Sequence, residues 1–183
     1  MSLRLFVALR PPVAIRERLL ALMGGIAAAR WQDDEQLHLT LRFVGEVDER
    51  TAEDLAAALA QVHAPAPCVA LAGVGRFGDA RRTAALWAGV APHDGLAGLH
   101  RKVDRACVRA GLPPERRAYL PHVTLARLPR SAGADPAIDR WLADAGGLAS
   151  APFDMTWLIL YESRLGRDGA RYEPLARWPL EPI

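Results

Sequence analysis

Two short segments of the sequence repeat one arrangement of histidine and threonine, with an apolar residue after each. They read HLTL at 38–41 and HVTL at 122–125. Along a β-strand, residues i and i+2 face one side and residue i+1 faces the other. Each segment, if extended, therefore presents an imidazole and a hydroxyl side by side, with apolar side chains anchored on the opposite face.

These residue types suit acid–base chemistry on a phosphate ester. Histidine has an unperturbed pKa of about 6.5, so one imidazole can accept a proton near neutrality while a second one donates. A neighbouring hydroxyl can donate a hydrogen bond to a non-bridging phosphate oxygen. Cyclic phosphates fit this layout well, because ring strain already lowers the barrier to attack. GxxxxGK[ST] does not occur, which argues against Walker-type phosphoryl transfer. GVGRFG at 73–78 has the GxGxxG spacing, but it ends a predicted strand that is followed by a second strand and not by a helix, which argues against dinucleotide binding for hydride transfer.

Other uses of the histidines are weaker. His63, His93 and His100 have no adjacent hydroxyl and are expected at the surface or at helix caps. A zinc site built from His38 and His122 stays open as an alternative, but neither segment carries a nearby Asp, Glu or Cys to complete it. We therefore expect neither a metal nor another cofactor.

The composition is that of a globular protein with a phosphate-compatible surface. Of 183 residues, 51% are apolar and 24% are charged, which argues against disorder. Lys102 is the single lysine among 23 basic residues, and arginine binds phosphate oxygens in a bidentate manner. The net charge of +2 is too small for a protein that coats duplex nucleic acid. No segment predicts a secretory signal or a membrane span, and two cysteines fit a reducing compartment. We expect a cytoplasmic monomer.

Hydrophobic periodicity predicts an α+β fold with mainly antiparallel sheets and outer helices. The predicted helices cover 13–28, 50–62, 94–110 and 135–146. The predicted strands cover 3–9, 37–44, 68–77, 84–90, 119–128, 153–163 and 170–180. The second half repeats the order of the first without a linker, so residues 1–183 are expected to form a single two-lobed catalytic domain.

The repeated motifs and several other fragments resemble the 2H phosphoesterase superfamily. More narrowly, the chain is similar to the RNA 2′,3′-cyclic phosphodiesterases once called 2′-5′ RNA ligases. The resemblance rests on RLFVAL at 4–9, HLTLRFVGEV at 38–47, GVGRFG at 73–78, LWAGV at 86–90 and LPHVTLAR at 120–127. It implies a bilobal, pseudo-symmetric fold in which two mainly antiparallel sheets, with helices outside, enclose a central cleft.

The resemblance also implies an activity and roles for the motif residues. The family hydrolyses terminal 2′,3′-cyclic phosphates of RNA to 2′-phosphomonoesters without metal. Its implied partners are RNA 3′ ends or small cyclic-phosphate nucleotides. His38 would be the general acid and His122 the general base, although the opposite assignment stays open. Thr40 and Thr124 would hold the phosphate.

Three further residues are candidates for substrate binding. In similar proteins the positions of Phe43 and Arg127, each five residues after a motif histidine, contact the base and the phosphate. Strict strand alternation instead places Arg42 on the His38 face and turns Arg127 away from His122. A β-bulge or a strand end just past Leu41 and Leu125 would reconcile the two expectations.

Two alternative functions remain at this point. Some family members join tRNA halves through a 2′-5′ linkage in a reversible reaction, so ligation is one alternative. The other is a non-catalytic module that binds nucleotides or RNA ends in the same cleft.

Overall fold

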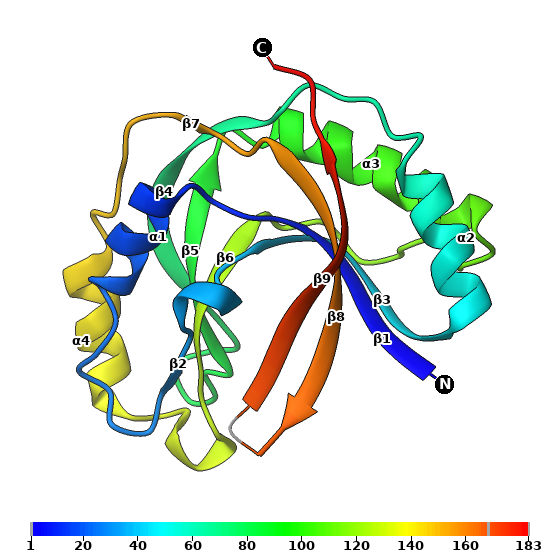
Figure 1. Ribbon diagram of the computed structural model, residues 1–183. Coiled ribbons are helices and arrows are strands. Elements are labelled where there is room, and N and C mark those ends of the chain that lie inside the picture. Colours follow the sequence, from blue (N-terminus) through cyan, green and yellow to red (C-terminus); the bar gives the residue numbers. More distant parts are fainter. Residues whose placement is uncertain (1, 168, 183) are drawn as a thin grey trace.

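The computed structural model describes residues 2–167 and 169–182, in which nine strands and four α-helices follow one another (Figure 1). The strands are β1 (Ser2–Leu9), β2 (Arg30–Trp31), β3 (Leu39–Asp48), β4 (Cys68–Phe77), β5 (Ala85–Ala91), β6 (His122–Arg127), β7 (Phe153–Asp154), β8 (Trp157–Gly166) and β9 (Gly169–Pro179). The helices are α1 (Val13–Leu20), α2 (Glu49–Leu59), α3 (Asp94–Arg109) and α4 (Pro136–Ala145), and the 3-10 turns are η1 (Asp34–Gln36) and η2 (Arg130–Ala132). The expected α+β class is confirmed.

The strands form one continuous sheet with the order β7-β4-β5-β6-β3-β1-β8-β9, and β2 is added beside β6. All pairings between these named strands are antiparallel. The strands that carry the two motifs, β3 and β6, meet at the residue pair Leu39 and Val123. The two sheets expected from the sequence are therefore two halves of one sheet, joined at this pair.

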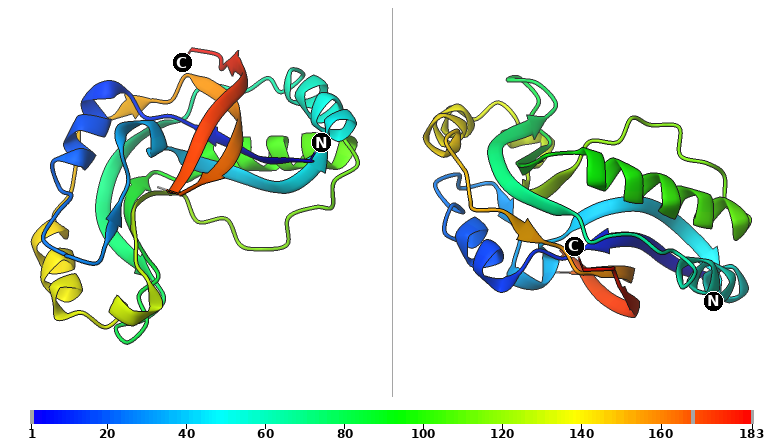
Figure 2. Two further views of the ribbon diagram at one scale, coloured as in Figure 1. Left: turned by 60° about the horizontal axis from the view of Figure 1, so that its bottom comes forward. Right: turned by 90° about the horizontal axis from the view of Figure 1, so that it is seen from above.

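Each half is built outward from a motif strand. In the β3 half, β3 is followed by β1, β8 and β9, and in the β6 half, β6 is followed by β5, β4 and β7. Figures 1 and 2 show α2 and α3 at one end of the molecule and α1 and α4 at the other. Helices α2 and α3 contact β3, and α4 contacts β4. The helices thus cover the outer faces, as expected from the sequence.

The apolar residues of the motifs form the centre of the core. Leu39, Val123 and Leu125 are fully buried, and Leu41 is nearly so. Since successive strand residues face opposite sides, burying these four turns the histidines and threonines of the motifs toward the inner face. The core therefore fixes the direction in which the chemical groups point.

The helices begin and end close to the expected positions, with one exception. The Asp48 carboxylate caps α2 by accepting a hydrogen bond from the Thr51 amide (2.8 Å). Helix α1 stops at Leu20, well before the expected end at residue 28. Gly24 and Gly25 follow with φ values of 129° and 81°, which are incompatible with a right-handed helix. No helix in the described part of the chain is long and apolar enough to cross a membrane.

The junction between the two halves is expected to contribute to the free energy of unfolding. Leu39→Ala is expected to lower the free energy of unfolding by about 2–5 kcal/mol, because it opens a cavity where the halves join. Urea denaturation followed by linear extrapolation measures this change. The matched control is Leu165→Ala, at a leucine that is 73% exposed, where a change within about 0.5 kcal/mol is expected. Equal stability of the two variants would contradict the role given to the junction.

Candidate active site

The four motif residues lie together on the inner face of the sheet. Because Leu39 pairs with Val123, the two motifs run past each other in opposite directions about this point. A pocket of about 1070 Å³ is lined by residues of both halves. Among them are His38, Thr40, His122 and Thr124. The structure therefore brings together the residues that the repeated motif singled out.

Both imidazoles are oriented by the backbone in the same way. Nδ1 of His38 lies 2.7 Å from the Gln36 carbonyl oxygen, and Nδ1 of His122 lies 2.7 Å from the Leu120 carbonyl oxygen. A carbonyl can only accept a hydrogen bond, so Nδ1 carries the proton in each ring. In the neutral ring, Nε2 is then unprotonated and available to a substrate. Each motif thus offers the same ring nitrogen to the pocket.

An aromatic ring covers each imidazole. The Phe6 ring centroid lies 4.8 Å from that of His38, and the Phe77 centroid lies 4.8 Å from that of His122. Burial lowers the pKa of His38 to about 4, against the opposing effect of its hydrogen bond to Gln36. Burial also lowers the pKa of His122 below its ordinary value. Both imidazoles are therefore neutral at pH 7 in the unliganded protein.

Nearby positive charge contributes to these shifts. The guanidinium of Arg127 lowers the pKa of both imidazoles, and His122 adds a small further lowering at His38. A bound anion would offset this charge and favour a protonated imidazole. Five arginines line the pocket, whereas Glu115 is the carboxylate among its described lining residues. The arginines are Arg4, Arg30, Arg42, Arg117 and Arg127. This charge balance suits a phosphate ligand.

A β-bulge follows each motif and sets which residue faces the pocket next. On β3, Thr40 pairs with Ala8 and Arg42 pairs with Val7, so Leu41 is an extra residue. On β6, Thr124 pairs with Trp87 and Ala126 pairs with Leu86, so Leu125 is the extra residue. Two consecutive residues are buried at each bulge, after which the alternation is reversed.

The bulges turn Phe43 and Arg127 toward the pocket. Both residues line it, and the Phe43 ring is 54% exposed and lies 6.2 Å from the Phe6 ring. Strict alternation, which turned Arg127 away from His122, is therefore wrong beyond the bulges. Strands β3 and β6 are antiparallel, so Phe43 and Arg127 lie at opposite ends of the pocket.

Arg42 forms part of the pocket wall, but its guanidinium is held by α3 and by the segment that follows it. Arg42 is buried, and its guanidinium forms ion pairs with Glu115 (3.0 Å) and Asp104 (3.1 Å). It also donates a hydrogen bond to the Pro113 carbonyl. Glu115 in turn accepts hydrogen bonds from the backbone amides of residues 116 and 117, which lower its pKa. These contacts place Arg42 as a support for the loop that leads to the second motif.

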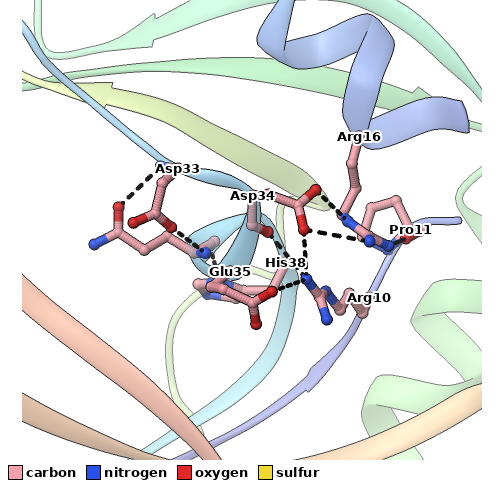
Figure 3. Close-up of polar contacts among 8 residues, drawn as sticks. Arg10, Pro11, Arg16, Asp33, Asp34, Glu35 and His38 are labelled. Carbon is pink, nitrogen blue, oxygen red and sulfur yellow. Dashed lines mark hydrogen bonds and ion pairs between the residues drawn. The ribbon is translucent and has the colours of Figure 1, made fainter. Parts of the chain in front are cut away.

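The turn before the first motif is fixed by a charged cluster (Figure 3). Asp34 accepts hydrogen bonds from Arg10 (2.9 Å) and Arg16 (2.8 Å), and the Arg16 guanidinium lowers its pKa. Within η1, the Asp33 side chain and Gln36 cap each other. The Gln36 amide also donates to the Ala170 carbonyl of β9 (2.7 Å). The cluster therefore holds in place the Gln36 carbonyl that orients His38.

His100 and Tyr119 are among the pocket residues that the sequence does not predict. His100 was expected at the surface or at a cap, and this is wrong: its ring stacks on Tyr119 with a centroid distance of 4.2 Å, and both rings line the pocket. Nδ1 of His100 donates to the carbonyl of Leu41, the bulged residue (2.8 Å). No local sequence pattern signals this contact, because it depends on the bulge.

The histidine pair bears on the zinc alternative. Within residues 2–167 and 169–182, no group of three or more His, Cys, Asp or Glu side chains is arranged to hold a metal ion. Cys107 is buried and Cys68 is exposed, and both are free thiols.

The support role of Arg42 predicts a loss of stability when it is replaced. Arg42→Met leaves Asp104 and Glu115 without their shared cation and is expected to lower the free energy of unfolding by about 3–5 kcal/mol. Urea denaturation measures this. Arg164→Met is the control, because Arg164 is exposed and its pairs with Glu162 and Glu173 are expected to contribute no more than about 1 kcal/mol. A stable Arg42→Met protein with weakened substrate binding would show instead that Arg42 acts on the ligand.

Comparison with known proteins shows the family of the chain and agrees with its fold. The model of the 2′-5′ RNA ligase superfamily matches residues 11–167. A relative from Aeropyrum pernix, named RNA 2′,3′-cyclic phosphodiesterase, is 33% identical over 78% of this chain and 81% of its own length. A relative of the same name from Escherichia coli is 30% identical over 97% of this chain and 96% of its own length. The crystal structure of E. coli LigT complexed with 3′-AMP is 28% identical and covers 98% of this chain and 99% of its own, with a TM-score of 0.73. The chain belongs to the 2′-5′ RNA ligase superfamily.

Proposed function

We propose that this protein hydrolyses the terminal 2′,3′-cyclic phosphate of RNA to a 2′-phosphomonoester, without a metal ion, as a single two-lobed catalytic domain. The observation that carries the proposal is the pair of imidazoles from opposite halves of the sheet, each anchored through Nδ1, that line one pocket. The names of the relatives, RNA 2′,3′-cyclic phosphodiesterase, support the substrate class.

The reaction needs one proton acceptor and one proton donor. His122 Nε2 takes a proton from water, and the water oxygen forms a bond to phosphorus. The bond between phosphorus and the 3′ oxygen breaks, and His38 Nε2 gives its proton to that oxygen. One P–O bond forms and one breaks, and the proton lost by His38 is balanced by the proton gained by His122. The hydroxyls of Thr40 and Thr124 donate hydrogen bonds to the non-bridging oxygens.

Substrate binding prepares His38 for this role. In the free protein the pKa of His38 is about 4, so its Nε2 is unprotonated at pH 7. The negative phosphate, placed between the imidazoles, raises the pKa of both and favours a proton on one of them. Arg127 offsets the remaining charge on the phosphate, and the exposed ring of Phe43 offers a stacking surface for the base.

Ligation is the second candidate function, because the matching family model is described as 2′-5′ RNA ligase. The same pocket would open the cyclic phosphate with another nucleophile: the 5′ hydroxyl of a second RNA replaces water, loses its proton to His122 and bonds to phosphorus as the bond to the 3′ oxygen breaks. Incubation with cleaved tRNA halves tests this candidate. A joined product, sensitive to the loss of either histidine, would establish it.

Replacing either histidine is expected to abolish hydrolysis. His38→Ala and His122→Ala should each reduce kcat for a 2′,3′-cyclic-phosphate dinucleotide by roughly 10²–10⁴-fold, the range for general acid–base catalysis. The product's phosphate position, read by NMR, distinguishes a 2′- from a 3′-monophosphate.

His63→Ala is the matched control, because His63 is exposed and lies outside the pocket lining. It should turn over substrate like the unaltered protein. Near-normal hydrolysis by either motif variant would refute the paired-histidine mechanism. Tight binding of a 2′-phosphate end without any turnover by the unaltered protein would establish the non-catalytic module instead.

The lowered pKa values predict a pH profile. Turnover needs one neutral and one protonated imidazole, so kcat/KM rises through the lower pKa of the free protein and falls through the higher one. With His38 at about 4 and His122 below 6.5, the maximum of kcat/KM is expected below pH 6.5. The maximum of kcat lies at higher pH, because bound phosphate raises both pKa values.

Arg127→Gln serves as the matched variant for this profile. Arg127 lowers the pKa of both imidazoles, so its loss should move the kcat/KM profile to higher pH, whereas Arg127→Lys should keep its position. The profile is measured with and without EDTA. Loss of turnover on chelation would favour the zinc alternative over the metal-independent reaction.

A further inference from the structure

A second arginine lies directly beside Arg127. Arg30 of β2 pairs with Arg127 of β6 in the antiparallel register, and both side chains are exposed and line the pocket. Directly opposite residues in an antiparallel pair have side chains on the same face, where like charges repel. The fold therefore places two guanidinium groups side by side at one end of the pocket.

The neighbours of Arg30 fix its side of the sheet. Trp31 packs toward the core, with its ring centroid 5.6 Å from that of Trp141. Arg30 and Gln32, on either side of Trp31, face the pocket and line it. The Gln32 amide donates to the Leu125 carbonyl (2.8 Å), which extends the pairing of β2 with β6. A Cβ added at Gly169 would lie 3.9 Å from Arg30 Nη1, so the guanidinium lies at the rim beside the β8–β9 hairpin.

Neither arginine forms an ion pair with a carboxylate of residues 2–167 or 169–182. Other arginines of the protein do: Arg10 and Arg16 bind Asp34, and Arg42 binds Glu115. Two neighbouring arginine side chains that pair with no carboxylate of the described residues form a strong site for a phosphate, which both can bind through charge-assisted hydrogen bonds.

We infer that Arg30, beside Arg127, forms a second phosphate position, which binds the phosphodiester on the 5′ side of the terminal nucleotide, and that Arg127 is shared between this phosphate and the reacting one. The inference rests on the proposed function. The ribose of that nucleotide carries the base, the cyclic phosphate and the 5′ oxygen. With the cyclic phosphate between the histidines and the base toward Phe43, the 5′ oxygen is the group left to extend toward the opposite end, where Arg30 and Arg127 lie.

This position makes the protein an enzyme of RNA ends rather than of free mononucleotides. A 2′,3′-cyclic mononucleotide without a 5′ phosphate leaves Arg30 without a ligand, whereas a dinucleotide fills both phosphate positions. A contact remote from the reacting phosphorus can be equally strong in the ground state and in the transition state. Loss of such a contact raises KM and leaves kcat unchanged.

The test compares a 2′,3′-cyclic mononucleotide with a 2′,3′-cyclic-phosphate dinucleotide. Arg30→Gln should raise KM for the dinucleotide by roughly 10- to 100-fold, the loss expected for a charge-assisted contact, and should change the mononucleotide KM by less than about twofold. The slope of log(kcat/KM) against log[salt] for the dinucleotide should fall in magnitude by about 0.7, the value for one phosphate contact on a single strand. The dinucleotide KM of Arg30→Lys should lie between those of the unaltered protein and of Arg30→Gln.

Arg140→Gln is the control, because Arg140 is exposed on α4 and lies outside the pocket lining. It should leave both substrates unchanged. Equal effects of Arg30→Gln on both substrates, or none on either, would overturn the inference while the proposed function stands. If Arg4→Gln loses the preference for the dinucleotide and Arg30→Gln keeps it, the RNA extends toward the Arg4 end of the pocket. This result would also overturn the inference. If the unaltered protein hydrolyses neither substrate, the proposed function itself fails.

Discussion

The pairing of Leu39 with Val123 is the contact on which the site depends. It is the point where two halves of the sheet, each carrying one motif, become one sheet. Burial of the two side chains on the outer face turns the neighbouring imidazoles and hydroxyls inward, since strand residues alternate. A shift of one residue in this register would move every one of those groups to the opposite face. A single backbone pair thus converts two separate motifs into one chemical centre.

The geometry around this contact is set mainly by the backbone. Carbonyls of Gln36 and Leu120 fix the protonated nitrogen of each ring, and aromatic rings beside the imidazoles remove water and lower their pKa. The charged cluster around Asp34 and the buried Arg42 act one step further out, because each holds a segment that ends in one of those carbonyls. These charged groups do not face the pocket themselves, but they support the positions of the imidazoles that do.

The sequence predicts those parts of the site that depend on local order. The histidine–threonine spacing and its apolar neighbours predict two half-buried strands, which the structure has, and the strand-rich class follows from hydrophobic periodicity. The bulges at Leu41 and Leu125 arise from pairing with β1 and β5. The alternation of residues along a single strand does not predict them. The contact of His100 with Leu41 and the pairing of Arg30 with Arg127 likewise join segments distant along the chain. Helix α1 was overestimated because alanine-rich sequence continues past Leu20, although the glycines at 24 and 25 end any helical path.

The two bulges have a consequence for direction. Up to Leu41 and Leu125 the two strands present matching groups, so the centre of the pocket has approximate two-fold symmetry. Beyond the bulges the match ends: one strand presents a phenyl ring and the other a guanidinium. A nucleotide is itself asymmetric, with a flat base at one side and an anionic chain at the other. For the proposed RNA substrate, the direction of the bound chain, and with it the imidazole that faces the leaving oxygen, would therefore be set by the ends of the pocket and not by its middle.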